Sequence, residues 1–167
     1  MARRAGKDNG DAPAPRESMF TTAHLTSGVA VALAMGLDGW PLFAFVGASV
    51  LTDWDYVFQL ATGRNHRTFI THSPPVYLAV LGPLGLWQPL AWWILAGSML
   101  HFSLDIWEYG IRLNPLERRV YGFRLMPGIE KLAFRDYLRA YFHDKRFQVA
   151  EIVFALTAGA LVAWRFL

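Results

Sequence analysis

The side chains best suited to chemistry in this chain are imidazoles and carboxylates in four short blocks of an otherwise apolar sequence. They are His24, Asp53, Asp55, His66, His72, His101 and Asp105. Cysteine is absent, so disulfides, thiolate ligands and thiol nucleophiles are excluded. Histidine and carboxylate would have to hold any transition metal, and these donors suit Zn²⁺, Mn²⁺ or Fe. The residue types therefore predict a divalent metal site, with zinc as the leading candidate.

The spacing inside two of these blocks suits metal binding. His101 and Asp105 are four residues apart, so on a helix they share one face with Cβ atoms about 5–6 Å apart. Asp53 and Asp55 flank Trp54, and in an extended stretch both carboxylates would point the same way. One of them could then bind the metal while the other orients a histidine. Each pair alone is also typical of a salt bridge or a helix cap, so the metal site is predicted from their combination.

Apolar stretches of helical length must position these side chains. They span residues 22–37, 40–51, 76–81, 90–107 and 150–164. Charged residues make up 17% of the chain, below the roughly 25% of soluble domains, and 54% of residues are hydrophobic. A membrane-spanning helix needs about 20 residues, and these stretches reach that length when their polar ends are included. We therefore expect an all-α, polytopic membrane bundle of four to five transmembrane helices; a soluble all-α protein with a buried core is the alternative.

Basic residues are distributed unevenly along the chain. Residues 17–111 contain two of them, whereas residues 112–148 hold nine Lys and Arg against four Asp and Glu. Positively charged loops stay in the cytoplasm, so the N-terminus and the loops 61–75 and 108–148 are expected on that side. All seven candidate side chains then gather at the cytoplasmic edge of the bundle. Ionisable groups at membrane depth usually pair, bind an ion or do chemistry.

The order of the blocks resembles that of a known family. The blocks are AHLTSG (23–28), LTDWD (51–55), HRTFITHS (66–73) and HFSLD (101–105). Over about residues 20–110 they are similar to the YdjM-type inner-membrane proteins, which are classed as metal-dependent hydrolases. That family is more distantly similar to the all-helical zinc-dependent phospholipases C and P1-type nucleases. The likeness implies that the metal is bound by Asp55 (or Asp53), His72 (or His66), His101 and Asp105, with His24 as a further candidate ligand.

Four segments are predicted along the chain. They are a disordered N-terminal tail (1–19), a membrane-embedded metal-dependent hydrolase core (20–110), a basic cytoplasmic loop with an amphipathic helix (111–148) and a C-terminal transmembrane helix (149–167). The first apolar run is expected to be an uncleaved membrane helix, with a cleaved signal peptide as the alternative. The amphipathic helix is expected to lie on an anionic lipid surface or to pack against the protein's own helices.

The predicted function is hydrolysis of a phosphoester, with phospholipids among the candidate substrates, by a metal-activated water. Asp53, if it does not bind the metal, is the candidate general base, and Arg67 could stabilise charge on the phosphoryl group. Thr71 and Ser73 are expected to orient His72 or the loop backbone. The alternative function is that of a non-catalytic membrane metal-binding or scaffold protein with a structural metal site.

The expected location is the inner (plasma) membrane, with several passes and with the N-terminus and the metal site on the cytoplasmic side. Expected partners are membrane lipids and a small-molecule or lipid phosphoester substrate. Nucleic acid is not expected as a partner, because the basic segment reads better as a surface for anionic lipid.

Overall fold

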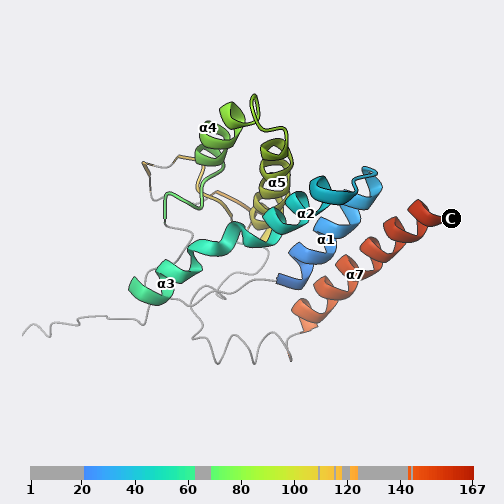
Figure 1. Ribbon diagram of the computed structural model, residues 1–167. Coiled ribbons are helices and arrows are strands. Elements are labelled where there is room, and N and C mark those ends of the chain that lie inside the picture. Colours follow the sequence, from blue (N-terminus) through green and yellow to red (C-terminus); the bar gives the residue numbers. More distant parts are fainter. Residues whose placement is uncertain are drawn as a thin grey trace, which may run out of the picture.

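The described part of the chain is built from helices (Figure 1). A computed structural model describes residues 21–62, 69–108, 110–114, 116–117, 121–123, 143 and 145–167. The helices are α1 (Thr21–Ala34), α2 (Gly39–Leu51), the 3-10 helix η1 (Thr52–Asp55), α3 (Tyr56–Thr62), α4 (Pro74–Leu84), α5 (Leu90–Glu108) and α7 (Lys145–Phe166). Within these residues the one pairing of β type is an isolated bridge between Ile111 and Tyr121. The expected all-α class is confirmed for the described residues.

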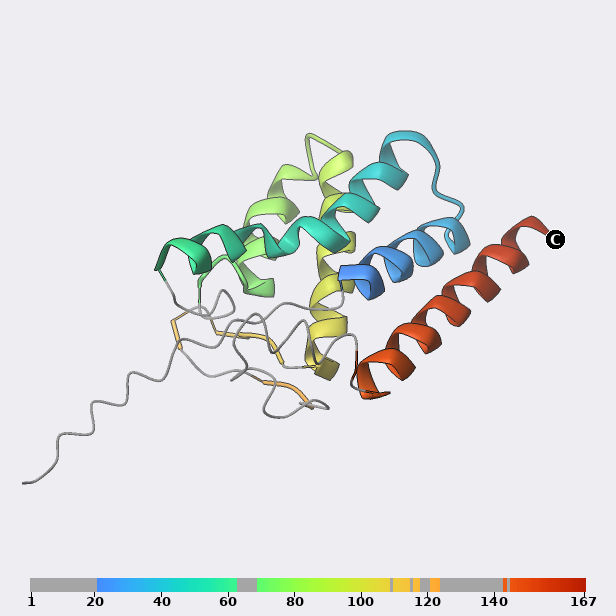
Figure 2. The same ribbon diagram turned by 90° about the horizontal axis from the view of Figure 1, so that it is seen from below.

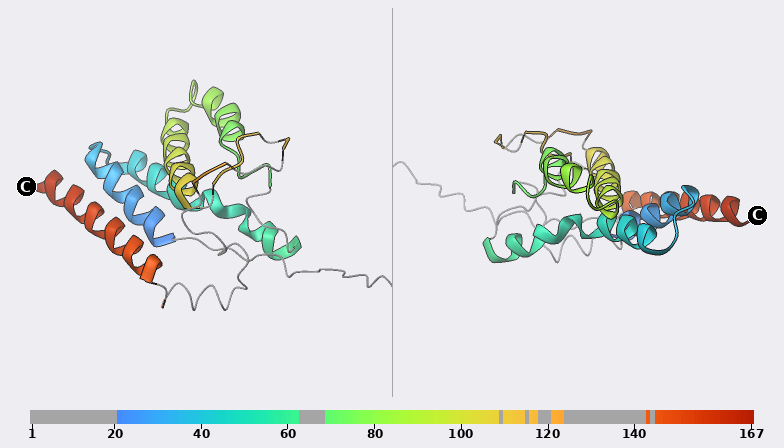
Figure 3. Two further views of the ribbon diagram at one scale, coloured as in Figure 1. Left: turned by 180° about the vertical axis from the view of Figure 1, so that it is seen from behind. Right: turned by 45° about the horizontal axis from the view of Figure 1, so that its top comes forward.

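The helices pack around α2 and α5, which share the most extensive helix contact of the described residues. α1 packs against α2, and α4 packs against α5. Seen from below, α7 runs beside α1 on the side away from α5 (Figure 2). From behind, α3 continues roughly in line with α2 and extends away from the bundle (Figure 3).

A glycine-rich turn reverses the chain between α1 and α2. Gly36 has a φ of 73°, a left-handed conformation that ends α1, and the Leu37 N–H donates to the Ala32 carbonyl at 3.0 Å. Asp38 then precedes the first residue of α2 in an extended conformation. Because the two helices run in opposite directions, the start of α1 lies beside the end of α2. The predicted break at residues 38–39 is thus where the first two helices separate.

Glycine allows three helices to approach at backbone distance. A Cβ at Gly97 of α5 would collide with the backbone carbonyl of Phe45 in α2, and a Cβ at Gly28 of α1 would collide with the side chain of Ser49. Small residues at helix contacts are typical of membrane proteins, where close packing supplies much of the attraction. These contacts fix α1, α2 and α5 relative to one another.

The described helices do not support the expected set of four to five transmembrane helices. None of them combines the length and the apolar character that crossing a bilayer requires. α1, α2 and α4 contain 14, 13 and 11 residues, whereas a span needs about 20. The last helix, expected over 149–167, begins at Lys145 and so includes charged residues assigned to the basic loop.

Two predicted segments cannot be compared with the structure. The N-terminal tail (1–19) lies outside the described residues. Residues 124–142, which contain most of the expected amphipathic helix, also lie outside the described residues.

The chain folds back beneath the end of α5. Gly110 has a φ of 94°, and its N–H donates to the Asp105 carbonyl at 2.6 Å, which ends the helix. The Phe123 N–H donates to the Ile106 carbonyl at 2.8 Å. The Ser73 hydroxyl donates to the Arg112 carbonyl at 2.8 Å, which ties this segment to the loop before α4. One end of the bundle is thereby covered.

Candidate metal centre

Imidazoles and carboxylates from four separate segments meet at this covered end. His24 lies in the first turn of α1, Asp53 and Asp55 lie in η1, and His72 directly precedes the loop residue that caps α4. His101 and Asp105 lie in the last turns of α5. Antiparallel helices bring the beginning of one segment beside the end of the next, which is why residues 24 and 105 become neighbours.

Four of these side chains form a compact group, called the metal centre below: Asp53, His72, His101 and Asp105. Each offers one ligand atom, and these atoms all lie within 4.8 Å of one another. Asp105 Oδ2 lies 2.8 Å from His72 Nε2 and 3.4 Å from His101 Nε2, and Asp53 Oδ1 lies 3.2 Å from His101 Nε2. Three of the side chains have no solvent exposure, whereas that of Asp53 is 25% exposed. Asp53 is therefore the one member of the centre whose side chain reaches solvent, although its Oδ1, which faces His101, is buried.

The ring of His101 is oriented by the backbone of α2. Its Nδ1 lies 3.0 Å from the Ser49 carbonyl oxygen, which can only accept a hydrogen bond. Nδ1 therefore carries the hydrogen, and in the neutral ring Nε2 presents its lone pair to the carboxylates of Asp53 and Asp105. Nε2 is buried, and it makes no hydrogen bond to any described residue. A lone pair facing two carboxylates is unfavourable unless a proton or a cation lies between them.

The residues of the metal centre fit a divalent cation. Two imidazoles and two carboxylates, with no sulfur, form a donor set that suits Zn²⁺, Mn²⁺ or Fe. Burying several ionisable groups side by side costs free energy that a bound cation would offset. The approach of two carboxylates, Asp53 and Asp105, to Nε2 of His101 at 3.2 and 3.4 Å is the observation that favours a cation among these groups.

Asp55 lies beside the metal centre in an orienting position. Its side chain is fully buried, and its Oδ2 accepts a hydrogen bond of 2.8 Å from the Thr71 hydroxyl. The same oxygen lies 3.7 Å from Nδ1 of His72, whereas Asp105 contacts Nε2 of that ring. The resemblance favoured Asp55 as the metal-binding aspartate, but Asp53 is the one that lies in the four-residue group.

His24 supports the metal centre from α1. Its ring stacks on that of His101, with centroids 4.1 Å apart and planes 20° apart. Its Nε2 lies 3.7 Å from Asp105 Oδ1, the oxygen that faces away from His72. His24 therefore contacts two members of the centre without belonging to the group of four.

Two other predicted site residues lie outside the described part of the chain. They are His66 and Arg67. Of the two histidines that the sequence left as alternatives, His72 is the one whose position is described, and it lies in the metal centre.

Carboxylates raise the pKa of His72. Burial by itself would lower it, but hydrogen bonds to Asp105 and Asp55, together with the negative charges of Asp105 and Asp53, raise the pKa above the usual 6.5. Without a metal this ring holds a proton more firmly than an exposed histidine does. A metal that binds to His72 must displace that proton.

Sequence reasoning missed one of the groups that orient the centre and expected a different partner for another. Ser49 acts on His101 through its backbone carbonyl, and a backbone acceptor has no signature in the sequence. Thr71, which was expected to orient His72 or the loop backbone, instead donates to Asp55. Ser73 does contact backbone, at Arg112. The sequence signal for such orienting groups was limited to residues with hydrogen-bonding side chains next to a candidate ligand.

A comparison with protein families gives a match over most of the chain. A family model described as YdjM inner membrane protein matches residues 19–167. The match continues beyond residue 110, where the resemblance in the sequence blocks ended, and takes in the basic segment and the last helix. No curated protein and no solved structure matches. The more distant similarity to phospholipases C and P1-type nucleases stays a prediction.

Proposed function

Because the chain belongs to the YdjM inner membrane protein family, we propose that it is a metal-dependent hydrolase that works at the inner membrane and cleaves a phosphoester. The observation that carries the proposal is the buried group of two imidazoles and two carboxylates, in which the side chain of Asp53 is 25% exposed. Structural metal sites are closed by their protein ligands, whereas catalytic sites keep a position for water, and the partial exposure of Asp53 favours the second arrangement.

Asp53, His72, His101 and Asp105 are the residues proposed to hold the cation. A divalent cation, with zinc favoured by the donor set, supplies a Lewis acid that polarises a phosphoryl oxygen and lowers the pKa of water. Asp53, whose side chain is partly exposed, is the general base if it does not bind the metal. Asp55 and the Ser49 carbonyl hold the two imidazoles in orientation. Arg67 stays the candidate for stabilising charge on the phosphoryl group.

Metal analysis and an activity assay on matched variants test this proposal. Asp105→Asn keeps the shape of the side chain but removes the charge that both imidazoles face. We expect it to lose the metal and to lose hydrolysis of bis(4-nitrophenyl) phosphate, a general phosphodiester. His143→Gln is the control, because this histidine is exposed; it should keep both. Hydrolysis that persists in Asp105→Asn after the metal is gone would refute the mechanism.

A structural metal is the second candidate function, and the complete burial of His72, His101 and Asp105 favours it. In that case the wild-type protein would contain stoichiometric metal and would hydrolyse no phosphoester. Removing the metal would then lower the temperature of unfolding with no activity to lose. The assay above separates the two functions.

We propose further that the metal centre faces the cytoplasm in a chain that passes several times through the membrane. The exposed apolar side chains on α2, α4 and α7 support contact with lipid, and the basic segment 112–148 supports a cytoplasmic side.

Because the chain has no cysteine, single cysteines report this orientation directly. Leu86 and Leu116 are both exposed. In spheroplasts, a membrane-impermeant maleimide should label Leu86→Cys. It should label Leu116→Cys only after the membrane has been permeabilised. Equal labelling of the two before permeabilisation would rule out the proposed topology.

A further inference from the structure

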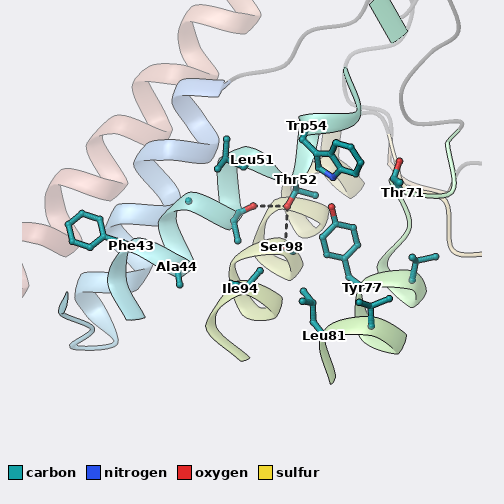
Figure 4. A pocket seen from close by; sticks show the side chains of 14 residues that line it. Phe43, Ala44, Leu51, Thr52, Trp54, Thr71, Tyr77, Leu81, Ile94 and Ser98 are labelled. Carbon is teal, nitrogen blue, oxygen red and sulfur yellow. Dashed lines mark hydrogen bonds between the residues drawn. The ribbon is translucent and has the colours of Figure 1, made fainter. Parts of the chain in front are cut away.

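An apolar groove of about 520 Å³ lies beside the metal centre, between α2, α4 and α5 (Figure 4). This volume falls within the range of about 300–1,000 Å³ that is typical of small-molecule sites. Leu81 of α4 and Ile94 of α5 line the end far from η1, as Figure 4 shows. The chemistry proposed for the metal centre does not involve this groove.

One end of the groove is polar and adjoins the metal centre. The hydroxyls of Thr52, Thr71 and Tyr77 lie there, and the Tyr77 ring points its hydroxyl toward Thr52 and Trp54 (Figure 4). Thr52 directly precedes Asp53, and the Thr71 hydroxyl donates to Asp55 at 2.8 Å. A molecule lying in the groove would thus place its polar end beside η1, the segment that carries Asp53 and Asp55.

The rim of the groove is also apolar. Phe43 and Leu51 of α2 are each 68% exposed, Val80 of α4 is 60% exposed and Trp54 of η1 is 50% exposed. Clustered apolar side chains around an opening are unfavourable in water and mark a surface that meets lipid or a hydrophobic ligand. The opening therefore suits a ligand that enters from an apolar phase.

We infer that the groove holds one acyl chain of the substrate, so that the hydrolase acts on a lipid phosphoester whose phosphate group lies at the metal centre. The inference rests on the proposed function and specifies its substrate class. The groove supplies apolar walls for the chain, and the cation-binding centre at its polar end is complementary to an anionic phosphate. A family located at the inner membrane has such lipids at hand.

Gly47 provides a direct way to fill the groove. It lines the groove, and a Cβ built there meets no atom within 4 Å. Gly82 in α4 has the same free space but does not line the groove, so it serves as a matched control. Gly47→Phe should occupy the space of several methylene groups, whereas Gly82→Phe should leave the groove open. Gly47→Leu is a smaller substitution to use if the larger one prevents folding.

The kinetic experiment compares the metal-loaded wild type and the two variants on a series of substrates: the ethyl, octyl and tetradecyl esters of 4-nitrophenyl phosphate. In the wild type kcat/KM should rise with chain length, because each buried methylene contributes up to about fourfold. Gly47→Phe should lose about tenfold or more on the tetradecyl ester while keeping the wild-type value on the ethyl ester. Gly82→Phe should match the wild type throughout, which also controls for partitioning of long chains into lipid.

A binding experiment tests the groove without turnover. Calorimetric titration with dodecyl phosphate should give weaker binding to Gly47→Phe than to Gly82→Phe, and butyl phosphate should bind both alike. If no ester is hydrolysed but this contrast is found, the proposed activity is wrong and the groove assignment stands. If the esters are hydrolysed with the same chain-length profile in all three proteins, the acyl-chain inference is wrong. A change of oligomeric state in Gly47→Phe with an unchanged profile would likewise overturn it, since the groove would then belong to a contact between copies.

Discussion

The two faces of α2 differ in how closely the neighbouring helices approach. Phe45 and Ser49, one turn apart, lie against glycines of α5 and α1 at distances that leave no room for a Cβ. Phe43, Gly47 and Leu51 lie on the other face and line the groove, where a Cβ at Gly47 has free space around it. One helix therefore has a packed face and an open face.

This difference separates the face that positions His101 from the face that we propose binds the substrate. On the packed face the Ser49 carbonyl holds His101, so the imidazole is fixed by backbone that cannot move without disturbing two helix contacts. On the open face a ligand can enter without altering those contacts. Rigid support behind reacting groups, with adaptable space in front, is what a catalytic site requires.

A pair of phenylalanine truncations should give the largest contrast, between the buried support of the metal centre and the rim of the groove. Phe102 is 2% exposed, and its ring contacts those of His72, His101 and Tyr77. Phe102→Ala should lower the free energy of unfolding by about 3–5 kcal/mol, because it leaves a cavity behind the metal centre. Phe43→Ala, at the exposed rim, should change it by no more than about 0.5 kcal/mol. Thermal unfolding of both variants measures the difference; equal losses would mean that the rim is not open.

A pair of glycine substitutions sharpens the comparison on a smaller scale. Gly97→Ala should destabilise the protein by about 1–3 kcal/mol, since the new methyl group meets the Phe45 carbonyl. It should also weaken metal binding, because α5 carries His101 and Asp105. Gly47→Ala should instead stabilise by up to about 1 kcal/mol, as alanine favours the helix. Chemical denaturation combined with metal analysis checks both, and a neutral Gly97→Ala would contradict the close approach of α2 and α5.

Acid should affect the metal centre and leave the groove unchanged. The pKa of His72 is raised, so in the metal-free protein its proton stabilises the fold at low pH, and that contribution is lost as the pH rises through the raised pKa. The metal and the proton compete for His72. The affinity for the metal should therefore fall about tenfold for each pH unit below this pKa. Competition with a chelator over a pH series measures the slope. Gly47→Phe should show the wild-type slope, and a constant affinity would exclude His72 as a ligand.

The smallest expected effect lies where the two faces meet. The hydroxyls of Thr52 and Ser98 are hydrogen-bonded at 3.1 Å, at the polar end of the groove (Figure 4). Ser98→Ala should cost about 1 kcal/mol in unfolding free energy. It should leave metal content unchanged, since Thr52 still donates to the Ala48 carbonyl at 2.6 Å. Loss of metal in this variant would show that the faces are coupled.

The sequence was informative where a spacing maps onto one element. His101 and Asp105 share a helical face, as four-residue spacing requires. Alternating helix direction also predicted that His24 and Asp105 would lie at the same end of the bundle, and they are 3.7 Å apart.

The sequence did not predict the local backbone conformation around Asp53 and Asp55. Asp53 and Asp55 were considered in an extended stretch, where they would point the same way. They lie instead in a 3-10 helix, yet both carboxylates approach the same atom, Nδ1 of His72, at 3.7 Å. Asp53 also lies 3.2 Å from His101 Nε2, whereas Asp55 accepts a hydrogen bond from Thr71, and the sequence did not predict this division. Gly47 and Gly97 look alike in the sequence, and only helix packing distinguishes free space from a collision.

The metal centre draws its ligand atoms from three places in the chain: η1, the loop before α4 and the end of α5. A cation bound there would cross-link these segments, whereas the contact between Gly97 and Phe45 needs no ion. Chelation should accordingly loosen the covered end of the bundle before the rest unfolds, with faster amide exchange near residues 53, 72 and 105. The lifetime of the folded chain would then depend on the supply of metal in the cell.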